Sequence, residues 1–180
     1  MQEEEILHQE IELTKTGPIR LGFEYQDACA AHLFVEWLNH PHRYKWVKLE
    51  ADEFGYLDDI TALNEKDGLH LKQIKFSCHP DCPKEAWKWE DLLKERKGKA
   101  KTKDSLFKKW YLSFKKIKKL AQHNGISIEV ITNHKADQDI ENSTILNGKG
   151  RSVDIKKLKS NKEVFDELIR QIGAGTEKDL

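Results

Sequence analysis

The sequence predicts an α/β protein in which a mixed β-sheet is flanked by helices. Two observations favour this class: one helical pattern precedes three strand-like runs, and two further helical patterns are followed by a β-branched run and a last helix. At 180 residues, the chain has the size of one medium domain. We expect residues 1–21 to form an N-terminal extension, residues 22–172 the folded domain, and residues 173–180 a tail or linker stub.

The N-terminal part is expected to contain two helices. Apolar residues at helical spacing in the first dozen residues predict a short amphipathic helix, followed by a break at Gly17-Pro18. Further apolar residues at mixed spacings of three and four predict a largely buried helix from about Phe23 to Leu38, ending at Asn39 before Pro41.

Three strand-like runs follow, over Tyr44–Glu50, Tyr56–Asn64 and Leu69–Ser77. The polar tetrapeptide Glu65-Lys66-Asp67-Gly68 joins the last two runs and predicts a β-hairpin. If the turn is centred near Lys66 and Asp67, antiparallel pairing places residue 59 beside residue 74.

The rest of the chain alternates helical and strand patterns. We expect Gly125 to end the longer of two helices and Gly173 to end the last helix. The predicted elements are helices over Trp87–Lys97 and Ser105–Gln122, an exposed loop over Lys97–Asp104, a strand over Ile126–Thr132 and a helix over Lys162–Ile172.

Composition predicts a soluble, cytosolic protein. No window approaches the roughly 18 consecutive apolar residues of a membrane helix, and the chain starts with an acidic segment where a signal peptide is basic. We therefore expect no membrane partner. The cysteines Cys29, Cys78 and Cys82 are an odd number, and the hydrophobic residues suffice for a core, so a disulfide framework is not expected.

A formal net charge of zero hides a charge gradient along the chain. Residues 1–60 contain 13 acids against 5 Lys and Arg, whereas residues 84–119 contain 14 Lys and Arg against 5 acids. Such a local positive excess suits binding to several phosphates with release of counterions. We expect the lysine-rich segment Lys94–Lys119 to contact the backbone of a nucleic acid rather than to be a solvated face alone.

The hairpin brings together the side chains that could bind a metal ion or take part in catalysis. Gln73 and Lys75 are two residues apart and share one face of their strand, and the predicted register places Asp59 next to both. Glu50 closes the preceding strand. We prefer Asp59 to its neighbour Asp58 as the metal-binding acid, because residue 59 lies opposite the Gln-x-Lys face.

Two carboxylates and a carbonyl suit a hard divalent cation. Mg²⁺ prefers oxygen ligands and keeps several waters, so Glu50, Asp59 and the backbone carbonyl of Ile74 would be a sufficient protein contribution. The ion would polarise a phosphoryl oxygen and lower the pKa of a bound water, while Lys75 orients that water and neutralises developing charge. The predicted reaction is phosphodiester hydrolysis.

These residues resemble a known family. Asp58-Asp59 before Ile60, the Gln73-Ile74-Lys75 strand and the helix opening Gly-x-x-Tyr-Gln at Gly22 are similar to the PD-(D/E)xK restriction-endonuclease-like superfamily. More narrowly, the chain resembles the dsDNA endonuclease effector domain of CD-NTase-associated effectors in bacterial CBASS defence and of some antiviral STAND NTPases. The resemblance runs from about Gly22 to Asn133 and includes Phe107-Lys-Lys-Trp110 and Ile131-Thr132-Asn133.

The resemblance implies a role for each site residue. Asp59 matches the metal-binding acid, Gln73 the position that usually holds Asp or Glu, and Lys75 the catalytic lysine. Glu50 matches the additional acid, and Gln26 matches a helix Glu or Gln that completes the site in Mrr-like relatives. Gln73 departs from the wider superfamily because a neutral amide attracts a divalent ion less than a carboxylate does.

The resemblance also implies function and partners. It predicts a restriction-endonuclease-like fold and a metal-dependent endonuclease that cuts double-stranded DNA with one or two Mg²⁺ ions, or with Mn²⁺, as the effector of an anti-phage system. It further implies a homo-oligomer, driven by a C-terminal sensor domain if the chain is an excised module. The alternative is a non-catalytic nucleic-acid-binding or assembly module on a degenerate nuclease fold.

Other candidate sites are weaker. The run Cys78-His79-Pro80-Asp81-Cys82 resembles half of a zinc site, but no second Cys or His pair with ligand spacing accompanies it, so we favour a plain loop. No nucleophile elbow, Walker A or GxGxxG run is present. The aromatic residues Trp87, Trp89, Trp110 and Tyr111 are expected in the core rather than as base-stacking platforms.

Overall fold

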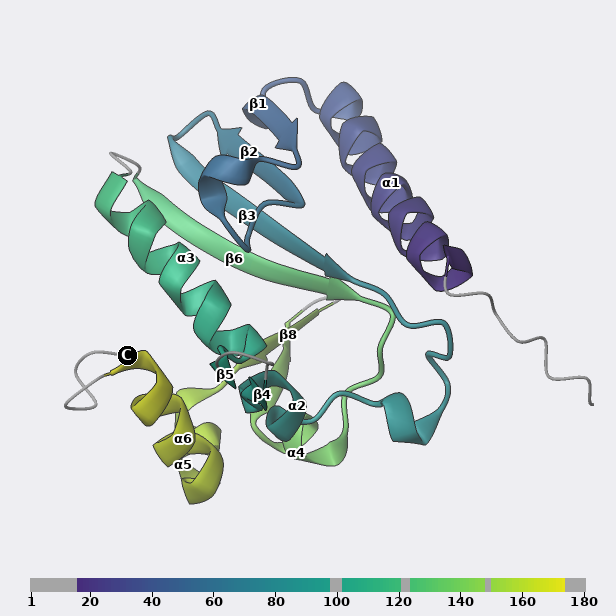
Figure 1. Cartoon of the computed structure of the whole chain (residues 1–180). Helices are drawn as coiled ribbons and strands as arrows, with labels where there is room; N and C mark the ends of the chain where they lie inside the picture. Colours follow the sequence, from purple (N-terminus) through teal and green to yellow (C-terminus); the bar gives the residue numbers. More distant parts are fainter. Residues whose placement is uncertain (1–15, 98–101, 121–123, 148–149, 174–180) are drawn as a thin grey trace, which may run out of the picture.

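A central β-sheet lies between two long helices in the computed structural model (Figure 1). The structure describes residues 16–97, 102–120, 124–147 and 150–173, so the helix expected in the first dozen residues lies outside the described part. The sheet has the strand order β1-β2-β3-β6. Strands β1, β2 and β3 pair antiparallel, whereas β6 pairs with β3 in parallel. The predicted mixed α/β sheet flanked by helices is confirmed.

The strands of this sheet are shorter than the sequence pattern predicts, except for β6. Their bounds are Tyr44–Leu49 for β1, Ile60–Asn64 for β2, Gly68–Lys75 for β3 and Gly125–Thr132 for β6. The expectation that a strand begins at Tyr56 is wrong, because the backbone N–H of Tyr56 donates to the Ser113 hydroxyl at 2.9 Å instead of to a strand. Gly125 starts β6, so the expectation that it ends the preceding helix is also wrong.

The turn between β2 and β3 fixes the register of the hairpin. The Asn64 side chain accepts hydrogen bonds from the N–H groups of Lys66 and Gly68 at 2.9 and 2.8 Å. Asp67 adopts a positive φ of 61°, a conformation that aspartate tolerates in turns. Because Gly68 already belongs to β3, the turn is one residue shorter than predicted.

The predicted register is therefore wrong by one residue. Ile60 pairs with Lys72 and Thr61 with Leu71, which places Asp59 opposite Gln73 rather than opposite Ile74. A one-residue slip moves a side chain to the other face of a sheet. In the observed register, Asp59, Gln73 and Lys75 all lie on the same face.

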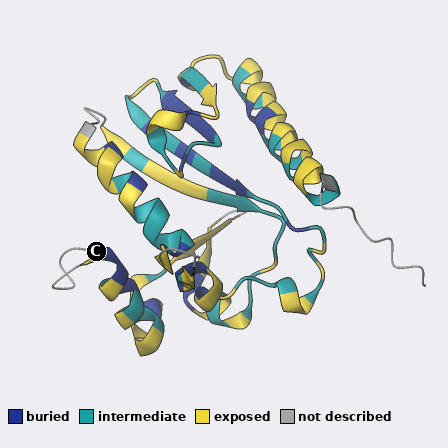
Figure 2. Ribbon diagram, in the orientation of Figure 1, coloured by how far each residue is buried: buried dark blue, intermediate teal, exposed yellow. Residues whose placement is uncertain are grey.

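Each face of the sheet packs on one helix (Figure 2). Helix α1 (Thr16–Asn39) covers one face, and α3 (Leu106–Leu120) covers the other. The core on the α1 side is formed by Ala30, Leu33, Tyr44, Ile60, Ala62 and Ile74, and the core on the α3 side by Leu57, Leu63, Leu69, Leu71 and Ile117.

Helix α1 differs from its prediction in two respects. It runs through Gly17-Pro18 without the expected break, because proline is tolerated in the first turn, where its missing N–H would be unpaired anyway. It is also not largely buried, since Ala30 and Leu33 are its buried residues among those described.

The C-terminal part is a layer of short helices that packs on the first half of α3. It contains α2 (Trp89–Leu93), α4 (Gln138–Asn142), α5 (Ile155–Ser160) and α6 (Lys162–Ile172). Helix α6 has the predicted bounds and ends at Gly173, whose φ is 64°. The core of this layer is formed by Trp89, Leu92, Leu93, Leu158 and Leu168, with Trp87 and Trp110 packed against it, as expected for these tryptophans.

Several short elements of this layer were not predicted. The helix expected over Trp87–Lys97 is shorter, because Trp87 is extended and bonds through its backbone to Lys135 and Asp137. The segment Lys97–Asp104, expected to be a loop, includes part of a small hairpin, although residues 98–101 lie outside the described part. The additional strands are β4 (Arg96–Lys97), β5 (Thr102–Lys103), β7 (Thr144–Asn147) and β8 (Gly150–Val153).

Candidate active site

Strand β3 carries the polar side chains of the candidate site at its C-terminal end. Leu69 and Leu71 are fully buried toward α3, and the next residues on that face are Gln73 and Lys75. Gln73 is 3% exposed, whereas the Lys75 side chain retains 34% exposure. The alternating pattern therefore leads from an apolar core directly to a half-open polar site.

Asp59 lies at the centre of this site. Its Oδ2 accepts a hydrogen bond from the backbone N–H of Ile74 at 2.5 Å and another from the Gln73 amide. The Lys75 ammonium lies 4.0 Å from the same oxygen and donates to the Ile74 carbonyl at 3.0 Å. Asp59, Gln73 and Lys75 are thus held in one cluster by the hairpin itself.

Glu50 joins this cluster from the end of β1. Its backbone N–H donates to the Asp59 carbonyl at 3.2 Å, and Ala51 bonds in the same way to Asp58 at 3.0 Å. Glu50 has a positive φ of 49°, an uncommon conformation for a residue other than glycine. Its carboxylate accepts a hydrogen bond from the Gln26 amide of α1, so α1 reaches the site through Gln26. All five side chains named from the sequence therefore lie in one place.

Burial at the site favours the neutral forms of Asp58, Asp59 and Lys75 over their charged forms. Burial raises the pKa of Asp59, and the nearby Glu50 carboxylate adds to this effect, although the Ile74 N–H, Lys75 and Gln73 oppose it. Burial also raises the pKa of Asp58, with a further contribution from the charges of Asp59 and Glu50. Burial lowers the pKa of Lys75 against the pull of these acids.

The excess of negative charge fits a divalent cation. Glu50, Asp58 and Asp59 are balanced by a single ammonium, that of Lys75, and oxygen donors dominate the cluster. Among residues 16–97, 102–120, 124–147 and 150–173, no group of three or more His, Cys, Asp or Glu side chains is arranged to hold a metal ion. The oxygen donors that the cluster does offer to a divalent ion are the carboxylates of Glu50 and Asp59 and the carbonyl of Ile74. The cysteines of the loop after β3, Cys78 and Cys82, form no disulfide.

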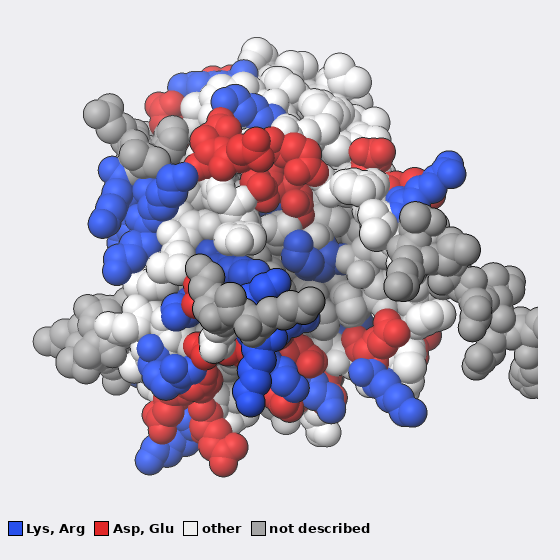
Figure 3. Space-filling view, in the orientation of Figure 1, with Lys and Arg blue, Asp and Glu red and all other residues white. Residues whose placement is uncertain are grey.

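Helix α3 supplies a basic surface beside the acidic site. Figure 3 shows acidic side chains gathered over the loop between β1 and β2, with Lys and Arg side chains along the side where α3 lies. Lys109 connects the two regions, because its Nζ lies 4.9 Å from the centroid of the Tyr56 ring. Tyr56 belongs to the loop that leads to Asp58 and Asp59. Lys115, Lys116, Lys118 and Lys119 are exposed along the same helix.

Two contacts that position the site were not predicted from the sequence. Asn133 follows β6, and its side-chain amide bonds to both the N–H and the carbonyl of Ser77 at 2.7 Å, which ties the end of β6 to the segment after β3. Ser113 of α3 holds the loop before Asp58 through Tyr56. The family resemblance includes Asn133 but assigns it no contact, and no sequence signal points to Ser113.

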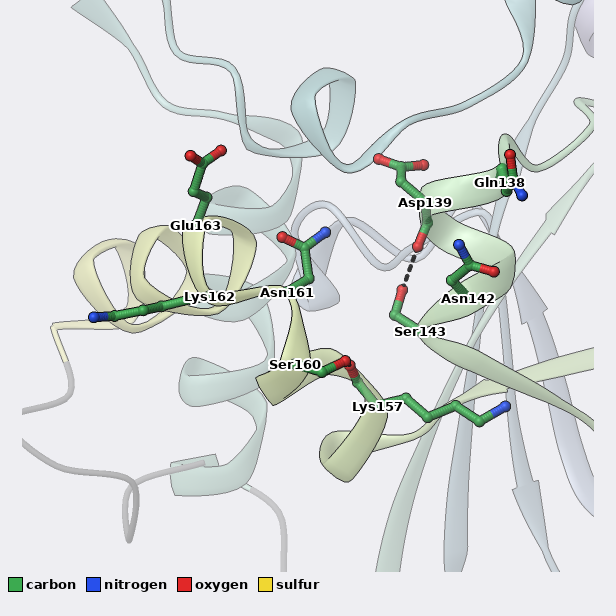
Figure 4. A pocket seen from close by; sticks show the side chains of 9 residues that line it. All are labelled: Gln138, Asp139, Asn142, Ser143, Lys157, Ser160, Asn161, Lys162 and Glu163. Atoms are coloured by element: carbon green, nitrogen blue, oxygen red, sulfur yellow. Dashed lines mark hydrogen bonds between the residues drawn. The ribbon is translucent and has the colours of Figure 1, made fainter.

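A hollow of about 490 Å³ lies between α4 and the α5–α6 pair. Figure 4 shows its lining residues, among which the Ser143 hydroxyl donates to the Asp139 carbonyl at 2.7 Å. None of its lining residues belongs to the cluster around Asp59. This hollow is therefore not part of the candidate active site.

The comparison with protein families decides the assignment. A family model described as the Cap4 dsDNA endonuclease domain matches residues 20–177. The chain belongs to this family. Searches among curated proteins and solved structures gave no significant match. As a Cap4-type nuclease domain, the chain is a dsDNA endonuclease with a restriction-endonuclease-like fold, and nucleases of this kind generally depend on a divalent metal ion.

The match also bears on the boundaries of the domain. It begins within α1, so this helix belongs to the Cap4-type domain together with the sheet. No helix in the described part of the chain is long and apolar enough to span a membrane. The division into an extension, a domain over residues 22–172 and a tail stays a prediction.

Proposed function

We propose that this Cap4-type domain is a Mg²⁺-dependent endonuclease that acts in the bacterial cytosol as the effector of an anti-phage system. The observation that carries the catalytic part is the contact of Asp59 with Gln73, Ile74 and Lys75 at the C-terminal end of β3. The proposed metal-binding groups are Glu50, Asp59 and the Ile74 carbonyl, with Mn²⁺ as an alternative ion. The defence role rests on the family resemblance.

Each side chain has a proposed part in the reaction. A divalent ion at this position supplies Lewis acidity toward a phosphoryl oxygen. Gln73 and the Ile74 N–H fix the orientation of the Asp59 carboxylate, and Gln26 does the same for Glu50. Lys75 orients the attacking water and stabilises negative charge that develops at the phosphate. Because the Lys75 side chain is partly exposed, its ammonium can reach a substrate while the methylene groups near the backbone stay packed.

The basic helix is the proposed binding surface for the DNA backbone. Lys109 extends over Tyr56 beside the acidic cluster, and the exposed lysines farther along α3 continue the positive surface away from it. Phosphate contacts by lysine position a duplex without reading its sequence. Replacing Lys115 and Lys116 together by alanine should therefore weaken DNA binding for every sequence and reduce its salt dependence.

A plasmid assay tests the catalytic proposal. Wild-type protein and the Lys75→Ala variant are incubated with supercoiled plasmid in Mg²⁺ or in EDTA, at several protein concentrations. Cleavage that needs Mg²⁺ and is lost in the variant supports the proposal. If both proteins bind DNA equally and neither cuts it, including after enforced dimerisation, a non-catalytic binding or assembly module becomes the better interpretation.

A further inference from the structure

A buried hydroxyl without a partner lies beside the candidate active site. Thr61 is fully buried in β2, and its Oγ1 has no hydrogen-bond partner. In the described part of the chain, the other buried side-chain atom of this kind is the indole nitrogen of Trp110, which can only donate. Thr61 therefore holds the one unused buried side-chain acceptor among the described residues. A buried polar group without a partner lowers stability, and one beside a polar site indicates a role that this conformation does not show.

The register of the hairpin makes this hydroxyl a neighbour of Gln73. Thr61 pairs with Leu71 across β2 and β3, and Leu71 belongs to the core on the α3 side. Gln73 is the next residue on that face of β3, so it is the diagonal neighbour of Thr61, at a distance of about 7–8 Å that a long side chain can span. Lys48, the partner of Thr61 in β1, bonds instead to Glu53 at 2.8 Å. Gln73 is thus the long polar side chain that can reach the hydroxyl from β3.

The Gln73 amide turns its nitrogen, and not its oxygen, toward Asp59. Its Nε2 donates to Asp59 Oδ2, the oxygen that also accepts the Ile74 N–H at 2.5 Å. An N–H group beside this carboxylate repels a cation, whereas an amide oxygen is a ligand that hard divalent ions accept. A rotation of the side chain that brings the oxygen to the ion moves the NH₂ group away from Asp59. Because Gln73 is 3% exposed, that NH₂ group then needs an acceptor within the protein.

We propose that the Thr61 hydroxyl accepts the Gln73 amide nitrogen when the amide oxygen turns toward a divalent ion at Asp59. This inference rests on the proposed metal site. Thr61 is then a positioning residue, because it touches neither the ion nor the DNA and stabilises the orientation of Gln73 that an ion requires. In the metal-free protein its hydroxyl stays unpaired. An acid at the position of Gln73 would have no N–H group to place, so the need for this hydroxyl arises from the amide.

Two substitutions at Thr61 should affect stability and metal affinity in opposite orders. Thr61→Val keeps the shape of the side chain without the hydroxyl, and Thr61→Ser keeps the hydroxyl without the methyl group. In metal-free buffer, Thr61→Val should unfold at the same or a higher urea concentration than the wild type, and Thr61→Ser at a lower one. In calorimetry, Thr61→Val should bind Mn²⁺ about tenfold more weakly, whereas Thr61→Ser should stay within about twofold of the wild type. A purely structural role would move both quantities in the same direction.

Thr144→Val is the matched control. Thr144 is also a buried threonine in a strand, but its hydroxyl donates to the Ile140 carbonyl at 2.9 Å. Thr144→Val should therefore lower the stability of the metal-free protein and leave Mn²⁺ affinity unchanged. An equal loss of affinity in Thr61→Val and Thr144→Val overturns the proposal, since the effect would then not depend on proximity to Gln73.

A double substitution tests the part of Gln73. Gln73→Glu replaces the amide by a carboxylate, so adding Thr61→Val in this background should change Mn²⁺ affinity by less than about twofold. If Thr61→Val weakens Mn²⁺ binding equally in both backgrounds, the hydroxyl serves a water or the ion instead of Gln73, and the proposal is wrong. If the wild type and Thr61→Val bind Mn²⁺ equally well, this inference alone fails. If the wild type binds no divalent ion, the proposed metal site fails with it.

Discussion

The two faces of strand β3 carry one lysine each, and the two lysines lie in contrasting surroundings. Lys72, on the α1 side, makes a close ion pair with Glu129 of β6, whose side chain is 59% exposed. Lys75, on the α3 side, stands 4.0 Å from an Asp59 carboxylate that is 14% exposed and already holds two other hydrogen bonds. The first pair is satisfied, whereas the second is desolvated and loosely held.

The difference teaches how to distinguish a structural ion pair from a candidate active site on the same strand. In the Lys72–Glu129 pair the two opposite charges already contact each other. In the second pair, burial raises the pKa of the acid and lowers the pKa of the lysine, so both groups gain from a substrate or ion that restores their electrostatic balance.

The largest expected effect separates the two lysines. Lys75→Ala should lower the rate of plasmid cleavage by about 10²–10⁴-fold, because it removes charge stabilisation at the reacting phosphate. Lys72→Ala should leave the rate within about threefold, since Lys72 faces α1. Linearisation of plasmid, followed on gels over time, measures both. Similar losses in the two variants would mean that the contrast between the faces has no catalytic meaning.

The next comparison is between the carboxylates of Asp59 and Glu129, the partners of the two lysines. Asp59→Asn should remove saturable binding of Mn²⁺, followed by calorimetry, whereas Glu129→Gln should keep it. The pKa of Asp59 is higher in the folded protein than in the unfolded chain. Ionisation of Asp59 therefore lowers the free energy of unfolding as the pH rises through these two pKa values. In metal-free buffer at pH 7, Asp59→Asn should therefore melt at the same or a higher temperature.

Addition of a divalent metal ion should make the wild-type protein melt at a higher temperature than Asp59→Asn. A bound divalent ion stabilises the folded wild-type protein by mass action, by about 2.7 kcal/mol at a hundredfold excess over the dissociation constant. The melting temperature of the wild-type protein should rise with Mn²⁺, and that of Asp59→Asn should not. A rise of equal size in both proteins would place the ion elsewhere.

The rate of cleavage should depend moderately on pH and should fall at both the acidic and the alkaline end. At Mg²⁺ concentrations below saturation, protons and the ion compete for Asp59, so the rate should fall toward acid at a higher pH than an ordinary aspartate would give, because the raised pKa of metal-free Asp59 favours its protonated form. It should fall toward alkali because the lowered pKa of Lys75 removes the ammonium charge early. Rates measured from pH 5 to pH 10 test both limbs. Lys75→Arg, which retains its charge, should lose the alkaline limb.

The smallest expected effect concerns the tether between α3 and the loop before Asp58. Ser113→Ala removes the acceptor for the Tyr56 N–H and should lower the free energy of unfolding by about 1 kcal/mol. Urea denaturation measures this change. Ser127→Ala, in β6 on the other face of the sheet, removes a bond to His70 of β3 and should not change cleavage. If Ser113→Ala alters neither stability nor cleavage, the α3 side does not position the site.

Sequence reasoning could reach the site because its parts are local. The β2–β3 hairpin connects Asp59 to Gln73 and Lys75 through a short turn, and strand periodicity assigns them to a shared edge. The register could not be settled in this way, because it depends on how the Asn64 side chain closes the turn. The prediction that α1 is largely buried is wrong, because helical spacing alone does not say whether an apolar face meets the sheet or the solvent.

The layer of short helices was harder to predict for a physical reason. Helices α4 and α5 have five and six residues, too few for a hydrophobic period, and their start is fixed by caps at Asp137 and Asp154. The strand pairs β4–β5 and β7–β8 are equally short. Tertiary packing around Trp89 and Leu168, rather than local propensity, gives this layer its structure.

The bridge from Asn133 to Ser77 has a consequence for the synthesis of the protein. The acid–lysine hairpin leaves the ribosome early, but Asn133, whose amide holds the segment after the hairpin, comes 56 residues after Ser77, and the flanking strand β6 comes 57 residues after its partners in β3. A nascent chain that stops before β6 has an open edge at β3 and no anchor beyond Lys75. The cell making this DNA-cutting protein is therefore exposed to a finished cutting centre only after most of the chain has been translated.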